Sequence, residues 1–232
     1  MKTIGMIGGM SWESSLEYYR LVNEGIKTRL GGLHSAQCLL YSVDFAPVEE
    51  LQRTANWQQA TQVMLDAAER LERGGADFVI ICTNTMHKMA GEVQRALSIP
   101  LLHIADATAA AIHAAGLHTV GLLGTRFTME QDFYRGRLED VHGLKVLTPP
   151  EHDRGQVHRI IYDELCRGQV LPHSRQTYRD VIARLQERGA QGIILGCTEI
   201  GMLVKAADST LPLFDTTQLH AQAAVAYALD EL

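Results

Sequence analysis

The chain contains two copies of one sequence pattern. Three pairs of segments match in the same order: residues 3–9 with 119–125, residues 75–85 with 189–199, and residues 99–102 with 211–214. The shifts between the copies are 116, 114 and 112 positions, so the second copy follows the first at an almost constant distance. An internal repeat of this length indicates a duplicated structural unit. We therefore expect two similar lobes.

Short runs of β-branched residues alternate with longer helical patterns, which predicts parallel strands joined by crossover helices. The expected strands cover residues 3–7, 37–42, 78–81, 101–103, 119–123, 145–147, 192–195 and 213–215. Eight strands and one duplication predict an α/β fold with two four-stranded parallel sheets and an active site in the cleft between the lobes. We expect the first lobe to comprise residues 1–103 and 211–232, and the second lobe residues 104–210.

The composition narrows the classes of partner. A net charge of -6 with dispersed Lys and Arg residues argues against nucleic acid and anionic membranes as partners. No leader sequence or run of about 18 apolar residues is visible, so we expect a cytoplasmic protein. We therefore expect a small molecule and a second copy of the chain as partners.

Neither the cysteines nor the glycines indicate a cofactor. The four cysteines form no CxxC pair, HExxH is absent, and we expect free thiols and no metal site. The spacing Gly5-x-x-Gly8-Gly9 differs from the dinucleotide-binding GxGxxG pattern. We therefore expect neither a metal nor a nucleotide cofactor.

The repeat pairs Cys197 with Thr83, immediately after matching strands. Ligand-binding loops of parallel sheets leave the carboxyl ends of the strands, so both turns are expected to border the cleft. A helix N-terminus there would lower the pKa of a thiol, and its free amides would bind a carboxylate. Two such turns can place one proton-transfer group on each face of an α-carbon, which is the geometry of stereoinversion.

Four segments carry a resemblance to a known family: Thr83-Asn-Thr-Met-His87, Gly196-Cys-Thr-Glu199, Gly5-Met-Ile-Gly-Gly-Met-Ser-Trp-Glu-Ser14 and Asp44-Phe-Ala-Pro-Val-Glu-Glu-Leu-Gln-Arg53. Together they resemble the cofactor-independent aspartate/glutamate racemase superfamily over nearly the whole chain. The resemblance implies a two-lobed homodimer in which two cysteines act as base and acid, without pyridoxal phosphate or a metal.

One motif position departs from the family pattern. Thr83 stands where the first cysteine is expected, and Cys82 precedes it by one residue. Because successive strand side chains point to opposite faces, we expect Cys82 to pack in the core. A threonine hydroxyl is far less acidic than a thiol, so the two faces of the site are chemically unequal. We expect a slow enzyme that handles one enantiomer better than the other, although the equilibrium between mirror images remains one.

The resemblance also assigns supporting roles. It implies Met10 and Ser11 near the substrate, Asn84, Thr85 and Thr198 at the α-carboxylate, Thr125 from the repeated turn, Glu199 beside Cys197, and Gln52 and Arg53 at the substrate side chain. Each has a plainer interpretation. Ser11 and Thr125 are also typical helix N-caps, Glu199 a first-turn charge, and Gln52 and Arg53 part of a solvated helix face.

Three functions remain open. The first is racemisation of aspartate, glutamate or a broader set of amino acids, the broader set following if Arg53 points to solvent. The second is a cofactor-free decarboxylase or isomerase of small diacids, because a lone thiol can protonate an enolate. The third is an amino-acid-binding protein whose catalysis is weakened by loss of the first cysteine.

Overall fold

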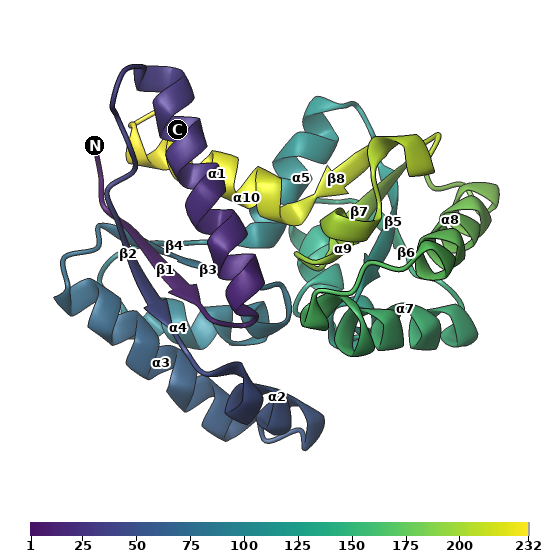
Figure 1. Cartoon of the computed structure of the whole chain (residues 1–232), viewed down its shortest axis with the longest axis horizontal. Helices are drawn as coiled ribbons and strands as arrows, with labels where there is room; N and C mark the ends of the chain where they lie inside the picture. Colours follow the sequence, from purple (N-terminus) through teal and green to yellow (C-terminus); the bar gives the residue numbers. More distant parts are fainter. Residues whose placement is uncertain (232) are drawn as a thin grey trace. The chain divides into compact units, whose positions relative to one another are not determined.

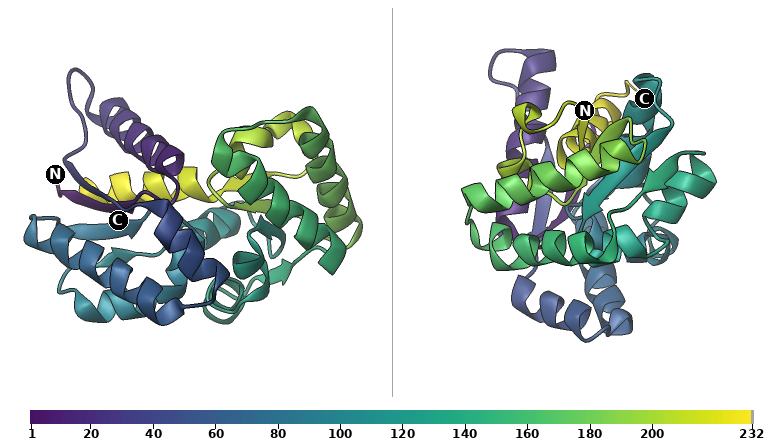
Figure 2. Two further views of the ribbon diagram at one scale, coloured as in Figure 1. Left: turned by 60° about the horizontal axis from the view of Figure 1, so that its bottom comes forward. Right: turned by 90° about the vertical axis from the view of Figure 1, so that its right-hand side faces the viewer.

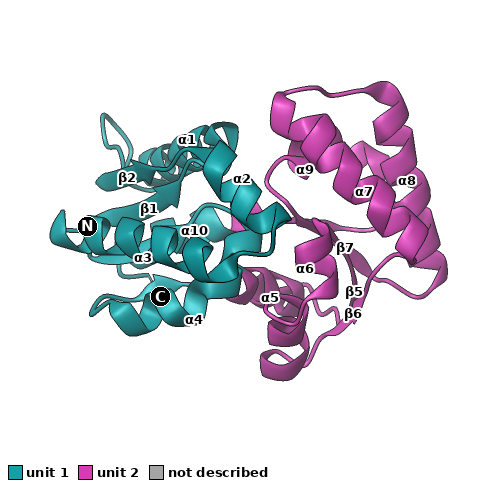
Figure 3. Ribbon diagram, turned by 90° about the horizontal axis from the view of Figure 1, so that it is seen from below, with its two compact units in different colours: residues 1–104, 220–232 teal, residues 105–219 magenta. Residues whose placement is uncertain are grey.

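The computed structural model describes residues 1–231, which form two compact units (Figure 3). Unit 1 comprises Met1–Ile104 and the chain from His220 onward, and unit 2 comprises Ala105–Leu219. Each unit contains a four-stranded parallel sheet with its own helices (Figure 1). The predicted α/β fold with two parallel sheets is confirmed.

The sheet of unit 1 has the strand order β2-β1-β3-β4. Its strands are β1 (Ile4–Gly8), β2 (Cys38–Ser42), β3 (Phe78–Ile81) and β4 (Leu101–Leu102). Ile4 of the central strand is in register with Cys38 on one side and with Phe78 on the other. All three pairings are parallel, so the turns that follow the strands lie at one edge of the sheet.

Helices cover both faces of this sheet (Figure 2). The helices of the chain up to residue 96 are α1 (Trp12–Leu30), α2 (Phe45–Arg53), α3 (Trp57–Arg73), the 3-10 helix η1 (Thr85–Met89) and α4 (Ala90–Ala96). Strand residues alternate between two cores: Ile80 packs with α1 and α10 (Thr216–Ala228), whereas Ile81 packs with α3 and α4. Both faces of the strands are thus apolar, as a parallel sheet requires.

The sheet of unit 2 has the equivalent order β6-β5-β7-β8. Its strands are β5 (Thr119–Gly124), β6 (Lys145–Leu147), β7 (Gly192–Gly196) and β8 (Leu213–Asp215). Its helices are α5 (Ile104–Ala114), α6 (Arg126–Glu130), the π-helix η2 (Arg137–Val141), α7 (Glu151–Asp163), η3 (Leu165–Arg167), α8 (Pro172–Glu187), α9 (Ile200–Leu203) and η4 (Ala206–Asp208). The three matching sequence segments correspond to β1 and β5, β3 and β7, and β4 and β8, so the duplication is structural.

The second boundary between the units differs from our expectation. We expected the chain to return to the first lobe near residue 211, but β8 pairs in parallel with β7, with Ile193 in register with Leu213. The backbone groups of β8 find their partners in this sheet, and the Thr216 hydroxyl donates to the carbonyl of Leu195 at 2.9 Å. The boundary therefore falls at His220, within α10.

Candidate active site

The turn after β3 carries the polar motif of unit 1. Thr83 is half-buried, while Asn84 and Thr85 are almost fully buried. The Ser14 hydroxyl donates to the carbonyl of Cys82 at 2.9 Å and thereby fixes the start of α1 against the end of β3. The position of Thr83 is thus set by the strand and by the neighbouring helix.

Cys82 lies in the core rather than in the turn. It is fully buried and packs with Ile80 among residues of α1 and α10. Burial raises the pKa of its thiol well above the usual range. The expectation that strand alternation turns Cys82 away from the motif is confirmed, and Thr83 remains the residue in the position equivalent to Cys197.

The turn after β1 is built for close packing. Gly9 has a φ of 90°, and a Cβ at this position would lie 2.1 Å from the carbonyl oxygen of Val43, so only glycine fits. Its N–H donates to the Ser15 hydroxyl at 2.7 Å. Ser11 is the N-cap of α1 and accepts a hydrogen bond from the Ser14 N–H at 3.4 Å. Ser11 therefore caps the helix, and Met10 beside it is buried.

Gln52 and Arg53 end α2 but have opposite environments. The Arg53 side chain is 62% exposed and forms an ion pair with Glu50. Gln52 is buried, and its amide donates to the sulfur of Met86 at 3.2 Å. We expected both residues at the substrate side chain. Gln52 is a buried, neutral amide, whereas the Arg53 guanidinium is paired with a carboxylate at the surface.

Unit 2 carries the second motif after β7. Cys197 is half-buried as a residue, and its thiol donates to the Glu199 carboxylate at 2.9 Å. Glu199 is itself buried at the N-cap of α9, and the Ile200 N–H donates to the Cys197 carbonyl at 3.1 Å. The backbone turn and the acidic side chain together fix the sulfur atom at the carboxyl end of β7.

The electrostatics of Cys197 differ from our expectation. Burial, followed by the negative charge of Glu199, raises the pKa of the Cys197 thiol well above its ordinary value. We expected a helix N-terminus to lower this pKa, but α9 spans only Ile200–Leu203 and its effect is outweighed. At neutral pH the resting residue is therefore a thiol, with a carboxylate placed to accept its proton.

The remaining motif residues of unit 2 lie in neighbouring turns. Thr125 follows β5 and caps α6, accepting from the Thr128 N–H at 3.3 Å. Thr198 lies between Cys197 and Glu199 and is half-buried. Because β5 and β7 pair directly, both turns occupy the same edge of this sheet. The N-cap interpretation of Thr125 agrees with the structure, and a contact with substrate remains a prediction.

Two further observations limit the kinds of site. Within residues 1–231, no group of three or more His, Cys, Asp or Glu side chains is arranged to hold a metal ion. Among the same residues, no helix combines the length and apolar character needed for a membrane crossing.

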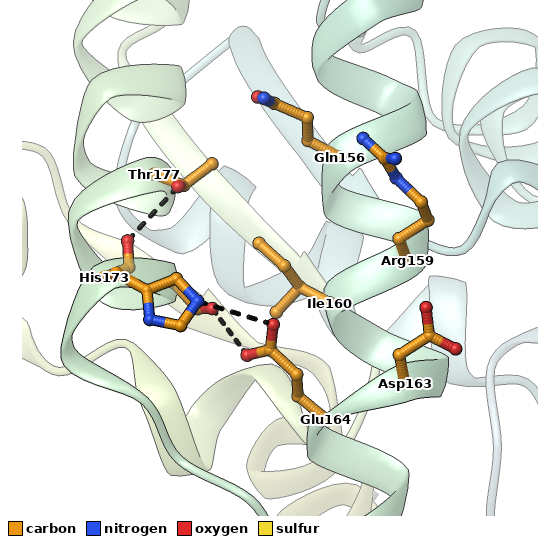
Figure 4. A pocket seen from close by; sticks show the side chains of 8 residues that line it. Gln156, Arg159, Ile160, Asp163, Glu164, His173 and Thr177 are labelled. Carbon is orange, nitrogen blue, oxygen red and sulfur yellow. Dashed lines mark hydrogen bonds and ion pairs between the residues drawn. The ribbon is translucent and has the colours of Figure 1, made fainter.

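A cavity of about 290 Å³ lies between α7 and α8 (Figure 4). Its lining includes Glu164, which accepts from the Ser174 hydroxyl, and His173, 3.8 Å from the same carboxylate. It contains no residue of either motif and is a separate feature of unit 2.

Sequence reasoning missed most of one buried cluster in unit 1. His87 is the last residue of the first motif, but His103 and His220 carry no sequence signal. The three imidazoles are buried together beside Tyr18. Their proximity depends on how α10 packs against unit 1. The expected return of the last segment to this lobe does not specify which side chains meet there.

The duplicated α/β fold and the paired turns define the class: the chain belongs to the Asp/Glu/Hydantoin racemase family, whose model matches residues 7–224. It is similar to a crystal structure described as a putative Asp/Glu racemase from Yersinia pestis. The two chains are 55% identical, with a TM-score of 0.92 over 99% of this chain and 100% of that one. An aspartate racemase homologue from Pyrococcus horikoshii OT3 is 33% identical, with a TM-score of 0.86 over 99% and 100% of the two chains.

Among curated relatives, the broad-specificity amino-acid racemase RacX of Bacillus subtilis (strain 168) is 26% identical over 173 residues. This match covers 75% of this chain and 74% of the relative. Membership of the family and similarity to racemases identify the protein as an enzyme of the amino-acid racemase type, in agreement with the prediction from the motifs.

Proposed function

We propose that the protein inverts the α-carbon of free amino acids without pyridoxal phosphate, with Thr83 and Cys197 serving opposite faces of that carbon. The observation that carries the proposal is the equivalence of these residues: each follows the same strand of its sheet, β3 in one unit and β7 in the other. Asn84, Thr85 and Thr198 then supply polar groups for the α-carboxylate, and Met10, Ser11 and Thr125 complete the surroundings.

The proton route begins at Cys197. Its thiol gives its proton to the Glu199 carboxylate 2.9 Å away, and the thiolate removes the α-proton of the substrate. The electron pair left on the carbon is delocalised into the α-carboxylate. A proton from the Thr83 hydroxyl, or from a water that it holds, reaches the opposite face of the carbon, and water then restores the hydroxyl. The hydroxide left by this water is neutralised by the proton that Glu199 releases to solvent, so that Cys197 ends as a thiol and Glu199 as a carboxylate.

This route is unequal in its two directions. Starting from the enantiomer whose α-hydrogen meets Cys197, carbanion formation uses a carboxylate-assisted thiol. The opposite enantiomer must lose its proton to a hydroxyl, which is a much weaker base at neutral pH. Mirror images have equal free energies, so kcat/KM for inversion must be the same in both directions, and the expected preference for one enantiomer cannot appear in that ratio. The asymmetry therefore appears as deuterium exchange that outruns inversion for one enantiomer only.

The substrate range that we propose is broad rather than strictly acidic. Recognition of a second carboxylate normally uses a well-placed cation, ideally a bidentate arginine. Arg53 is exposed and paired with Glu50, whereas the buried Gln52 offers a neutral amide. Uncharged polar amino acids should therefore be accepted beside aspartate and glutamate, consistent with the broad specificity named for the Bacillus subtilis relative.

We also propose that the enzyme is a homodimer that acts in the cytoplasm, where a reducing environment keeps Cys197 a thiol. The exposed face of α1 supports self-association: Trp12, Leu16 and Tyr19 are 64%, 57% and 49% exposed at helical spacing. The first turn of α1 is acidic and its last turn basic, so two antiparallel copies would be complementary in charge. Light scattering of the wild type and of Leu16→Glu tests this, and a monomeric wild type would refute it.

Proton NMR in deuterium oxide tests the function. The α-hydrogen signals of both enantiomers of glutamate, aspartate and several neutral amino acids are followed with wild type, Cys197→Ala and the control Cys38→Ala, which removes a thiol of unit 1. We expect signal loss that requires Cys197 and persists in the control. Carbon dioxide release from a small diacid would instead indicate a decarboxylase, and thermal stabilisation by an amino acid without exchange would indicate a binding protein.

A further inference from the structure

Three histidines are buried together in unit 1, outside the groups that the proposed mechanism uses. His87 belongs to η1, His103 follows β4, and His220 belongs to α10. The ring centroid of His87 lies 4.6 Å from that of His103 and 5.7 Å from that of His220. Charging imidazoles that are this close and this buried costs much free energy. The hydrogen bonds of each ring therefore show which neutral tautomer it adopts.

The bonds of His87 specify one tautomer. Its Nδ1 lies 2.7 Å from the carbonyl oxygen of Thr83, which can only accept, so Nδ1 carries the hydrogen. The backbone N–H of Ile104 donates to Nε2 at 3.2 Å, so Nε2 carries the lone pair. Only the neutral Nδ1–H form of His87 makes both bonds. One side chain thereby joins the Thr83 turn to the first residue of α5.

His220 holds the same segment from the other side. Its Nε2 donates to the carbonyl of Leu102 at 3.0 Å, and its Nδ1 accepts from the hydroxyl of the buried Tyr18 at 2.9 Å. The segment from Leu102 to Ile104 is therefore bonded at both ends by imidazoles, with His103 between them. The chain leaves unit 1 after Ile104 and re-enters it at His220, so the cluster occupies both crossing points.

From these contacts we infer that neutral His87 is a positioning residue. Its Nδ1–H fixes the backbone of Thr83, and its Nε2 ties that turn to the crossing segment at Ile104. The inference rests on the proposed role of Thr83 in inversion. In this role His87 gains and loses no proton during the reaction. The position of the Thr83 hydroxyl depends on both hydrogen bonds of the imidazole.

Three substitutions separate the two bonds. In His87→Asn the side-chain amide occupies the place of Nδ1 and retains the donor to the Thr83 carbonyl. In His87→Gln the amide oxygen occupies the place of Nε2 and retains the acceptor for Ile104. His87→Ala retains neither, and His113→Asn, on the exposed part of α5, is the matched control. Circular dichroism and thermal unfolding establish that each variant is folded before its rates are compared.

The inference predicts different effects on inversion and on exchange. Inversion, which needs Thr83, should fall about tenfold to a hundredfold in kcat for His87→Gln and His87→Ala, because both variants lose the buried hydrogen bond to the Thr83 carbonyl. His87→Asn should retain most of it. Exchange of the enantiomer that meets Cys197 should fall far less, because this exchange does not use Thr83. A general structural defect would instead lower both rates together. Equal losses in the Asn and Gln variants, or parallel losses of exchange and inversion, would overturn the inference.

Nitrogen-15 NMR of the histidines tests the bridge without any catalytic assay. At pH 7 the His87 ring should show a protonated Nδ1 and an unprotonated Nε2, and the His220 ring the reverse. The titratable groups packed around them are His103, Tyr18 and Cys82, and burial raises the pKa of the Cys82 thiol so that it stays protonated. A His87 ring that is Nε2-protonated or charged at pH 7 would refute the bridge even if racemisation is established. The expected tautomers without racemisation would instead refute the proposed function.

Discussion

Replacing Glu199 by glutamine removes the carboxylate that accepts the Cys197 thiol proton while retaining the size of the side chain. A hydrogen bond to a charged group is worth about 1.5 to 3 kcal/mol, and one pKa unit corresponds to about 1.4 kcal/mol. Loss of the 2.9 Å bond from Sγ to Oε2 should therefore lower the pKa of Cys197 and raise the ratio of thiolate to thiol about tenfold to a hundredfold. Loss of the like charge acts in the same direction.

The consequence for the thiolate can be measured directly. At pH 7.5, below the raised pKa of Cys197, the thiolate fraction should increase about tenfold to a hundredfold in Glu199→Gln. Alkylation by iodoacetamide, followed for each cysteine peptide by mass spectrometry, should accelerate by a similar factor at Cys197. The rate at Cys38 provides an internal reference, because its environment is unchanged.

Catalysis should change in the opposite direction. If Glu199 receives the thiol proton during the reaction, Glu199→Gln should slow deuterium exchange although more thiolate is present. Glu164→Gln, which alters another carboxylate of unit 2, should leave both measurements near the wild-type values. Exchange that rises together with the thiolate fraction would refute the role of Glu199, and an unchanged alkylation rate would refute the electrostatic argument.

Three other changes test separate parts of the reasoning. Thr83→Cys supplies a thiol on the second face, so inversion measured by chiral chromatography should rise toward the rate of exchange, and an unchanged ratio would exclude Thr83 from the proton path. Arg53→Ala removes an exposed guanidinium and should change KM for glutamate by less than about twofold, whereas a large loss confined to acidic substrates would show direct recognition. Burial acts to raise the pKa of Asp106, but the 2.6 Å bond from Arg137 outweighs it and the pKa is lowered. Asp106→Asn should therefore lower the free energy of unfolding by about 1 kcal/mol at pH 7, and urea unfolding should show this difference shrinking as the pH falls through the lowered pKa.

Much of the fold could be predicted from the sequence. The duplication fixes two equivalent sheets, and the β-branched runs locate all eight strands, because a parallel strand buried on both faces must be apolar throughout. Strand alternation also places Cys82 in the core and leaves Thr83 in the turn. These conclusions depend on local pattern and on the comparison of the chain with itself.

Other features depend on contacts between residues far apart in the chain. The assignment of β8 to the second sheet follows from its pairing with β7, which a short apolar run cannot specify. The raised pKa of Cys197 follows from burial and from the orientation of Glu199, although the sequence suggested a helix N-terminus that would lower it. Local sequence predicts the type of element, whereas desolvation depends on everything packed around a group.

The sequence by itself determined the duplicated α/β architecture, the paired motifs and the substitution of threonine for one cysteine. Only the tertiary structure decided that Arg53 pairs with a surface glutamate and that Cys197 rests as a thiol beside Glu199. It also decided that His87 and His220 both hydrogen-bond the backbone of residues 102–104. The physical reason is that periodicity records which face of an element is buried, while hydrogen-bond partners and burial are set by the packing of distant segments.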